Sequence, residues 1–101
     1  MKKIEQIQRI VRMEEKHDRI RDVMDRLLPL LEEYGSLQEE ISELVEYYQS
    51  EWRRDYEDDE KGKFPSELKR GILSEDTLYD LLCDNDSVLD KMRDLISQSD
   101  K

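Results

Sequence analysis

The stretch LLPLLEEYGSLQEE, residues 27–40, carries the strongest signal for a boundary between two helices. Gly35 is able to adopt the left-handed backbone conformation that commonly ends a helix. Ser36 and Glu39 then have the S-x-x-E spacing of a capping box, in which the two residues satisfy each other's free backbone donors. The stretch therefore predicts that one helix ends at residue 34 and that a second begins at residue 36.

Upstream of this boundary, apolar residues and one histidine recur at alternating steps of three and four. They are Ile10, Met13, His17, Ile20, Met24, Leu27, Leu31 and Tyr34. This spacing is typical of the heptad seam of a helix that packs against another helix. Ile4, Ile7 and Val11 extend the apolar stripe with a displacement of one residue. We expect one helix over residues 3–34, with a kink at Pro29, whose ring removes a backbone donor.

Downstream of the boundary, a second helix is predicted over residues 36–58. Its apolar face consists of Leu37, Ile41, Leu44, Val45, Tyr48, Trp52 and Tyr56. Because the connection between the two helices is so short, they are expected to lie antiparallel as neighbours. The main architectural prediction is thus a long antiparallel helical hairpin.

Two shorter helices are predicted after the break at Gly62 and Pro65. The first covers residues 75–83. The polar run DNDS, residues 84–87, is typical of a turn followed by a new N-cap, and the second short helix is expected over residues 87–98. The predicted fold is therefore all-α, with the two shorter C-terminal helices packed on the hairpin.

The composition agrees with a folded chain. Its 101 residues are enough for one core, so we expect residues 1–101 to form a single helical domain. Charged residues make up 44% of the chain and the net charge is -10, a balance also found in disordered proteins. Leu, Ile, Val and Phe nevertheless provide 25 residues, which is enough for a core.

The same composition argues against several classes of function. An acidic chain is a poor partner for the phosphates of nucleic acids, which bind lysine and arginine. No apolar run is long enough for a signal peptide or a membrane span, and Cys83 has no second cysteine for a disulfide within the chain. We therefore expect a cytoplasmic protein that contacts neither nucleic acid nor membrane.

Several short motifs together resemble a known family. They are Tyr47-Tyr48, Trp52, Asp55-Tyr56-Glu57, Gly71-Ile72-Leu73-Ser74-Glu75-Asp76 and Leu78-Tyr79-Asp80-Leu81-Leu82, with Met13-Glu14 as a weaker N-terminal element. In this pattern, which covers nearly the whole chain, the protein is similar to a domain-of-unknown-function family of short, acidic, helical bacterial proteins. The resemblance implies a bacterial origin and supplies no mechanism.

The acidic run DYEDDE, residues 55–60, invites comparison with a calcium-binding loop. A loop that begins at Asp55 has Glu60 where the sharp turn needs glycine, and Ser66 where a bidentate glutamate belongs. A register two residues later restores the glycine but lacks acidic ligands at its fifth and twelfth positions. Ion pairs across the hairpin explain the run better, with a basic row on the first helix formed by Arg9, Arg12, Lys16 and Arg19.

His17 is the only histidine, and Glu14-x-x-His17 has the spacing of half a di-iron carboxylate site in a helical bundle. The other half of such a site would come from a second chain. A seam histidine hydrogen-bonded at the edge of the core explains the same residues, so we expect neither a metal nor a cofactor. Cys83, beside Leu81 and Leu82, is expected to be a buried, inert thiol.

Tyr48, Trp52 and Tyr56 recur at intervals of four residues on the second predicted helix. A core stripe covered by the two short helices is the simpler interpretation. The alternative is a partly open groove that binds a helix or peptide of a partner.

The chain has no recognisable set of catalytic residues, so the leading prediction is a non-enzymatic helical module for protein–protein interaction. Its protein partner is unidentified, and a homodimer through Ile4, Ile7 and Val11 is one option. Two alternatives are an acidic decoy of a nucleic-acid-binding surface and a dimeric metal protein built from Glu14 and His17.

Overall fold

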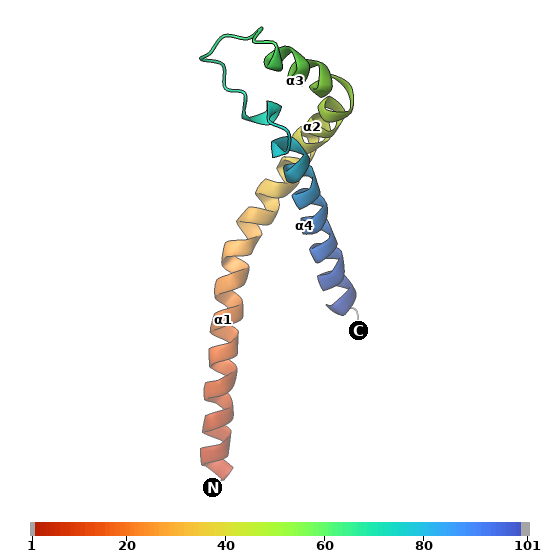
Figure 1. The fold of residues 1–101 in the computed structure, drawn as a ribbon. Helices are drawn as coiled ribbons and strands as arrows, with labels where there is room; N and C mark the ends of the chain where they lie inside the picture. The colour runs from red at the N-terminus through yellow and green to blue at the C-terminus, as the bar shows by residue number, and fades with distance from the viewer. Residues whose placement is uncertain (1, 100–101) are drawn as a thin grey trace. The chain divides into compact units, whose positions relative to one another are not determined.

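Residues 2–99, the part of the chain described by this computed structural model, are helical apart from turns and one loop (Figure 1). The elements are α1 (Lys2–Ser36), α2 (Gln38–Ser50), α3 (Trp52–Glu60), the 3-10 turn η1 (Gly71–Leu73) and α4 (Thr77–Ser99). Within this range no strand occurs, and the all-α prediction is confirmed. By their contacts the residues divide into two units, one ending at Glu39 and one beginning at Glu40. The antiparallel hairpin stays a prediction.

α1 is one continuous helix of 35 residues, and Pro29 lies inside it without ending it. At a rise of 1.5 Å per residue the helix extends about 52 Å. Figure 1 shows its ribbon running unbroken from the N-terminal end to the turn before α2.

The predicted cap at the end of this helix is wrong. Gly35 does not have a positive φ, and it lies within α1. The Ser36 hydroxyl donates back to the carbonyl oxygen of Glu33 at 2.6 Å instead of capping a new helix. The amide of Leu37 donates to the carbonyl of Tyr34 at 3.1 Å, so a tight turn at Leu37 separates α1 from α2. A serine at this position can cap the next helix or bond back to the preceding turn, and in Ser36 the backward bond forms.

The second predicted helix is present as α2 and α3, with only Glu51 between them. Helical hydrogen bonds continue through this point, from the Glu51 amide to Tyr47 and from the Asp55 amide to Glu51, both at 3.1 Å. The Ser50 hydroxyl donates to the carbonyl of Glu46 at 2.8 Å, a bond that often bends a helix. The two helices therefore form one distorted stretch rather than two separate elements.

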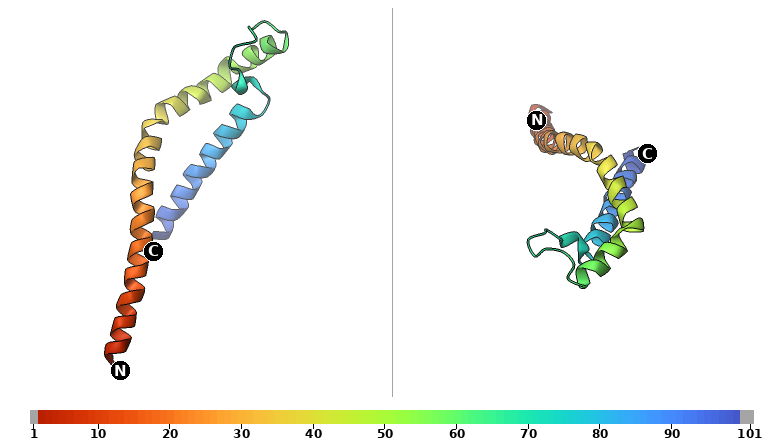
Figure 2. Two further views of the ribbon diagram at one scale, coloured as in Figure 1. Left: turned by 90° about the vertical axis from the view of Figure 1, so that its left-hand side faces the viewer. Right: turned by 90° about the horizontal axis from the view of Figure 1, so that it is seen from above.

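The chain leaves α3 through Gly62, whose φ of +71° is in the left-handed region that favours glycine. A loop over residues 61–70 then leads to η1, which lies against α3 and the start of α4 (Figure 2). This loop is the predicted break between the long and the short helices.

α4 is a single helix where the sequence predicts two, and the DNDS run of residues 84–87 lies inside it. Continuity places Leu82, Asn85, Leu89 and Met92 on one half-buried face. Asp84 and Asp86 are exposed, where their charges remain solvated. The helical preference of the flanking residues therefore outweighs the local preference of these polar residues for a turn.

The core lies where α3, η1 and the start of α4 meet. It consists of Trp52, Leu73 and Leu78, which are 7%, 7% and 1% exposed. Half-buried side chains pack around it: Leu44, Tyr47, Tyr48, Tyr56, Phe64 and Leu82. The Trp52 indole nitrogen donates to the carbonyl of Ile72 at 2.7 Å, which ties α3 to η1. No helix in residues 2–99 is long and apolar enough to cross a membrane.

Candidate functional site

An apolar stripe runs along one face of α1, called here the α1 face. It consists of the heptad residues Ile10, Met13, His17, Ile20, Met24, Leu27, Leu31 and Tyr34, flanked by Val23, Leu28 and Leu30. No residue of α1 is buried, and Tyr34 alone on this face is half-buried. Exposure of the apolar heptad residues ranges from 38% at Leu31 to 59% at Ile20. The predicted seam is therefore present, with its side chains open to solvent.

Local ion pairs support the helix that carries this face. Arg21 pairs with Asp25 at 3.1 Å and Arg26 with Asp22 at 3.0 Å, both at the i,i+4 spacing. Such exposed pairs contribute about 0.2–0.5 kcal/mol each. Most helical stability in proteins comes instead from packing an amphipathic face. The α1 face is thus a candidate binding surface.

Ile4, Ile7 and Val11, the residues predicted for a homodimer, lie on the same helix and are 58%, 59% and 50% exposed. They extend the α1 face toward its N-terminal end. Their role in association stays a prediction.

The aromatic row of the second predicted helix belongs to the core. Trp52 stacks on Tyr56 with ring centroids 5.1 Å apart and lies 5.4 Å from Tyr48 in a tilted contact. The ring of Tyr79 on α4 also makes a tilted contact with Tyr48, with ring centroids 6.3 Å apart. Because Trp52 is buried, a partner could reach this row only through the two half-buried tyrosines, and that interaction stays a prediction.

Beside the core lies an open groove of about 310 Å³, whose lining includes Tyr47, Asp55, Phe64 and Arg70. The Tyr47 hydroxyl donates to a carboxylate oxygen of Asp55 at 2.6 Å. Burial and this hydrogen bond raise the pKa of Tyr47 to about 12. The Tyr47 hydroxyl and the Asp55 carboxylate, the two groups that could act as acid or base here, are therefore hydrogen-bonded to each other. The tyrosine stays protonated near neutral pH.

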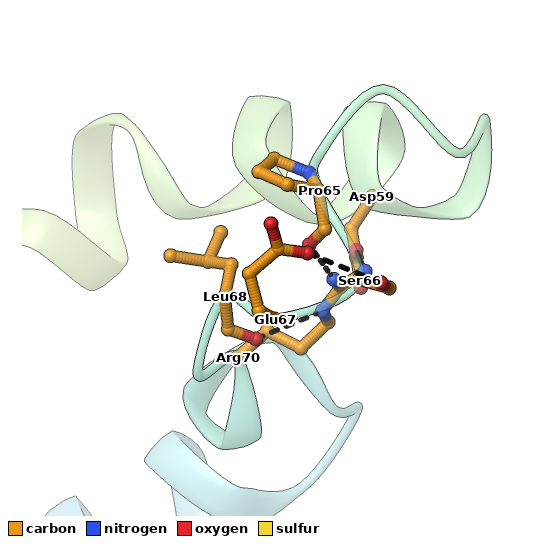
Figure 3. A network of polar contacts seen from close by, with 6 residues as sticks. All are labelled: Asp59, Pro65, Ser66, Glu67, Leu68 and Arg70. Atoms are coloured by element: carbon orange, nitrogen blue, oxygen red, sulfur yellow. Dashed lines mark hydrogen bonds and ion pairs between the residues drawn. The ribbon is translucent and has the colours of Figure 1, made fainter.

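Arg70 holds the loop over residues 61–70 to α3 (Figure 3). Its guanidinium donates to Asp59 at 2.7 Å, to the carbonyl of Leu68 at 3.3 Å and to the carbonyl of Pro65. Sequence reasoning missed this role, because nothing around Arg70 distinguishes it from the other basic residues.

The acidic run has cationic partners within its own unit. Asp59 pairs with Arg70, and Asp58 pairs with Lys63 at 3.3 Å, so these cations come from the following loop, and pairing with the basic row on α1 stays a prediction. Partners within eleven residues are easier to bring together than partners some fifty residues away, because closing a short loop costs less entropy. Asp55 is bound to Tyr47.

Glu14 and His17 do lie close together, and Asp18 joins them. One ligand atom from each can be found within 4.8 Å of the others, and His17 Nδ1 is 3.1 Å from a carboxylate oxygen of Asp18. All three side chains are exposed on a single helix. A structural or catalytic metal usually takes a fuller ligand set, with second-layer hydrogen bonds that orient it. A metal at this position would depend on ligands from elsewhere.

Cys83 is exposed, so the prediction of a buried thiol is wrong. In a continuous helix, successive residues point about 100° apart. Leu82 faces the core and Cys83 consequently turns away. A hydrogen bond between Cys83 and Tyr79, one turn earlier, raises the pKa of Tyr79.

Comparison with known proteins gives a family and no closer relative. No curated protein and no solved structure matches the chain. The model of the family described as a domain of unknown function, DUF4298, matches residues 10–95. The matched range begins at the first heptad residue of α1 and includes the whole Trp52 core and most of α4. The resemblance inferred from the sequence motifs is thereby confirmed, and the chain belongs to the DUF4298 family of domains of unknown function.

Proposed function

We propose that the protein is a non-enzymatic helical module that binds another protein chain through the α1 face. The observation that carries the proposal is the exposure of the heptad seam of α1 from Ile10 to Leu31. Isolated apolar side chains on a surface need no explanation, but a continuous apolar stripe marks an interaction surface. Heptad spacing further identifies the shape that fits it, another amphipathic helix.

The energy available from covering this face supports the proposal. Full burial of a Leu, Ile or Met side chain contributes about 1.5–3 kcal/mol, and the six exposed apolar residues from Ile10 to Leu31 still have about half of their surface open to solvent. Covering them would therefore contribute roughly 5–9 kcal/mol. Association costs about 4–15 kcal/mol, so this amount alone is marginal. The apolar surface of the partner, which is covered at the same time, adds to it, as do Val23, Leu28 and Leu30, which widen the face.

The proposal of a non-enzymatic role is supported by the hydrogen bonding of the polar groups in the groove beside the core. Tyr47 and Asp55 are bound to each other, and the raised pKa of Tyr47 makes it a poor acid or base near neutral pH. An acidic decoy of nucleic acid is less well supported, because Asp55, Asp58 and Asp59 already have partners in the same chain.

Capture of bound chains from the native cell, with matched variants, tests the proposal. In the seam variant, Ile20→Glu and Leu27→Glu place charges on the α1 face. In the control, Gln8→Glu adds a charge to the opposite side of the same helix, since position 8 lies outside the heptad seam. We expect wild type and the control to recover chains crosslinked to the protein, including a second copy of the protein itself. The seam variant should recover none of them. Equal recovery from the seam variant, or none from wild type, would overturn the proposal.

A further inference from the structure

We infer that the chain covering the α1 face is a second copy of the same helix, aligned antiparallel about Asp22. The inference rests on the proposed function and names its partner. Three features of α1 support it: the symmetry of the seam, the distribution of charge, and the residues that flank the seam.

The seam is complementary to itself in the antiparallel direction. Because four heptad a positions (Ile10, His17, Met24, Leu31) alternate with four d positions (Met13, Ile20, Leu27, Tyr34), reversal about Asp22 places every a residue opposite a d residue. Met13 then meets Leu31 of the partner subunit, and Ile20 meets Met24 of the partner subunit. The overlap covers 25 residues, about 37 Å of helix. A shift by one heptad leaves only six of the eight seam residues with seam partners, so the chosen register buries the most.

The charges of the chain favour the antiparallel direction. Residues 2–12 contain four Lys or Arg and one Glu, a net charge of +3. Residues 27–36, the end of α1, contain no Lys or Arg and two Glu, a net charge of -2. A parallel pair would bring like ends together, whereas an antiparallel pair places the basic start of each α1 beside the acidic end of the other. Arg9, next to the seam, comes within reach of Glu33 of the partner subunit.

The flanking positions agree with this arrangement. Val23 meets Val23 of the partner subunit, and the aliphatic stem of Lys16 covers Leu30 of the partner subunit. Arg21 meets the partner subunit's Arg21, but each is held by Asp25 of its own helix at 3.1 Å. In a parallel pair, Lys16 would instead lie beside Arg21 of the partner subunit on both sides of the seam.

His17 is the one polar residue of the seam. In the antiparallel register it packs against Leu27 of the partner subunit, while a parallel pair would place two histidines against each other. A polar seam residue lowers the stability of a helix pair and helps to fix its register. The two copies of His17 then lie ten residues apart along the pair, about 15 Å.

Disulfide trapping decides the orientation. In full-length chains that carry Cys83→Ser, Met13→Cys is made in one chain and Leu31→Cys in another chain of different tag length. We expect the mixture to oxidise mainly to the mixed dimer, at least tenfold faster than either variant forms a dimer alone. Efficient self-crosslinking of the Met13→Cys chain would show a parallel pair and overturn the orientation.

Sedimentation equilibrium decides the identity of the partner. The wild-type chain is expected to dimerise, Ile20→Glu to weaken the dimer at least tenfold, and the outward control Gln8→Glu to leave it within twofold. A wild-type chain that stays monomeric at high concentration would overturn the second copy as occupant, and the α1 face would then bind its own chain or a different protein. The capture experiment separates these cases: loss of bound chains from the seam variant keeps the proposed function even where the dimer fails.

Discussion

α1 and the Trp52 core show two different ways in which this chain treats apolar residues. α1 has 35 residues and none of them is buried, although apolar residues recur along it with heptad spacing. The core has only three buried residues, yet it joins α3, η1 and α4. A regular heptad pattern therefore predicts that a helix packs, but it does not say whether the partner belongs to the same chain.

The contacts of the two regions differ in range. The ion pairs along α1 connect residues four positions apart, such as Arg21 with Asp25, or the immediate neighbours His17 and Asp18. The core depends on longer connections, such as the hydrogen bond from Trp52 to Ile72, twenty residues away. The stability of the core should consequently be a property of one chain, while that of α1 should depend on protein concentration.

The largest expected effect comes from Trp52→Ala. Removal of a buried tryptophan leaves a cavity and an unpaired carbonyl at Ile72, and we expect the free energy of unfolding to fall by about 3–5 kcal/mol. Denaturant unfolding followed by far-UV circular dichroism measures it, and the loss should be the same at low and high protein concentration. Leu27→Ala on the α1 face is the matched variant, whose effect should grow with the fraction of associated chains. A loss below about 1 kcal/mol for Trp52→Ala would contradict the assignment of the core.

A smaller effect is expected from Arg70→Gln. The variant loses a charged hydrogen bond to Asp59, whose side chain is 18% exposed, and frees the loop over residues 61–70. We expect a loss of about 1–2 kcal/mol and faster amide hydrogen exchange in this loop.

The control for Arg70→Gln is Lys63→Gln, which breaks a pair with Asp58 in which the lysine is 58% exposed. An exposed pair of this kind contributes about 0–1 kcal/mol. Equal losses in the free energy of unfolding would show that the more buried Arg70–Asp59 pair contributes no more than the exposed Lys63–Asp58 pair.

Effects of opposite sign are expected at two glycines. Gly62 has a φ of +71°, so Gly62→Ala should lower the free energy of unfolding by about 1–2 kcal/mol. Gly35 lies in α1 without a positive φ, and a Cβ added there meets nothing within 4 Å. Gly35→Ala should therefore stabilise α1 by up to about 1 kcal/mol. A loss of stability at Gly35 would restore the left-handed cap that the sequence predicts.

The sequence was informative wherever side-chain period decides the outcome. The apolar period of 3.6 residues predicted the all-α fold, and the glycine at position 62 marked the end of α3. Polar residues that are typical of caps and turns were less informative, because the same residues also occur inside helices. Ser36 caps no helix, and its hydroxyl donates back to the carbonyl of Glu33. Asp84 and Asp86 lie on the exposed side of the continuous helix α4.

The sequence could not predict the role of Arg70, because the contact depends on how a loop folds against α3. Nor could it place Cys83, whose exposure follows from the continuity of α4 through residues that are typical of a turn. Spacing identified the heptad seam of α1 but assigned it to packing against the second helix. Its exposure, and the internal partners of Asp55, Asp58 and Asp59, required the structure.

The position of the single tryptophan has a consequence for optical spectroscopy. Trp52 is the only tryptophan of the chain, it is 7% exposed, and its ring stacks on Tyr56 and lies against Tyr48. Its fluorescence, including energy transferred from the two tyrosines, will report unfolding of the core region. It will not report unfolding of α1. Emission and helical ellipticity will therefore follow different transitions in the same sample, and the protein carries its own probe for separating the melting of its two regions.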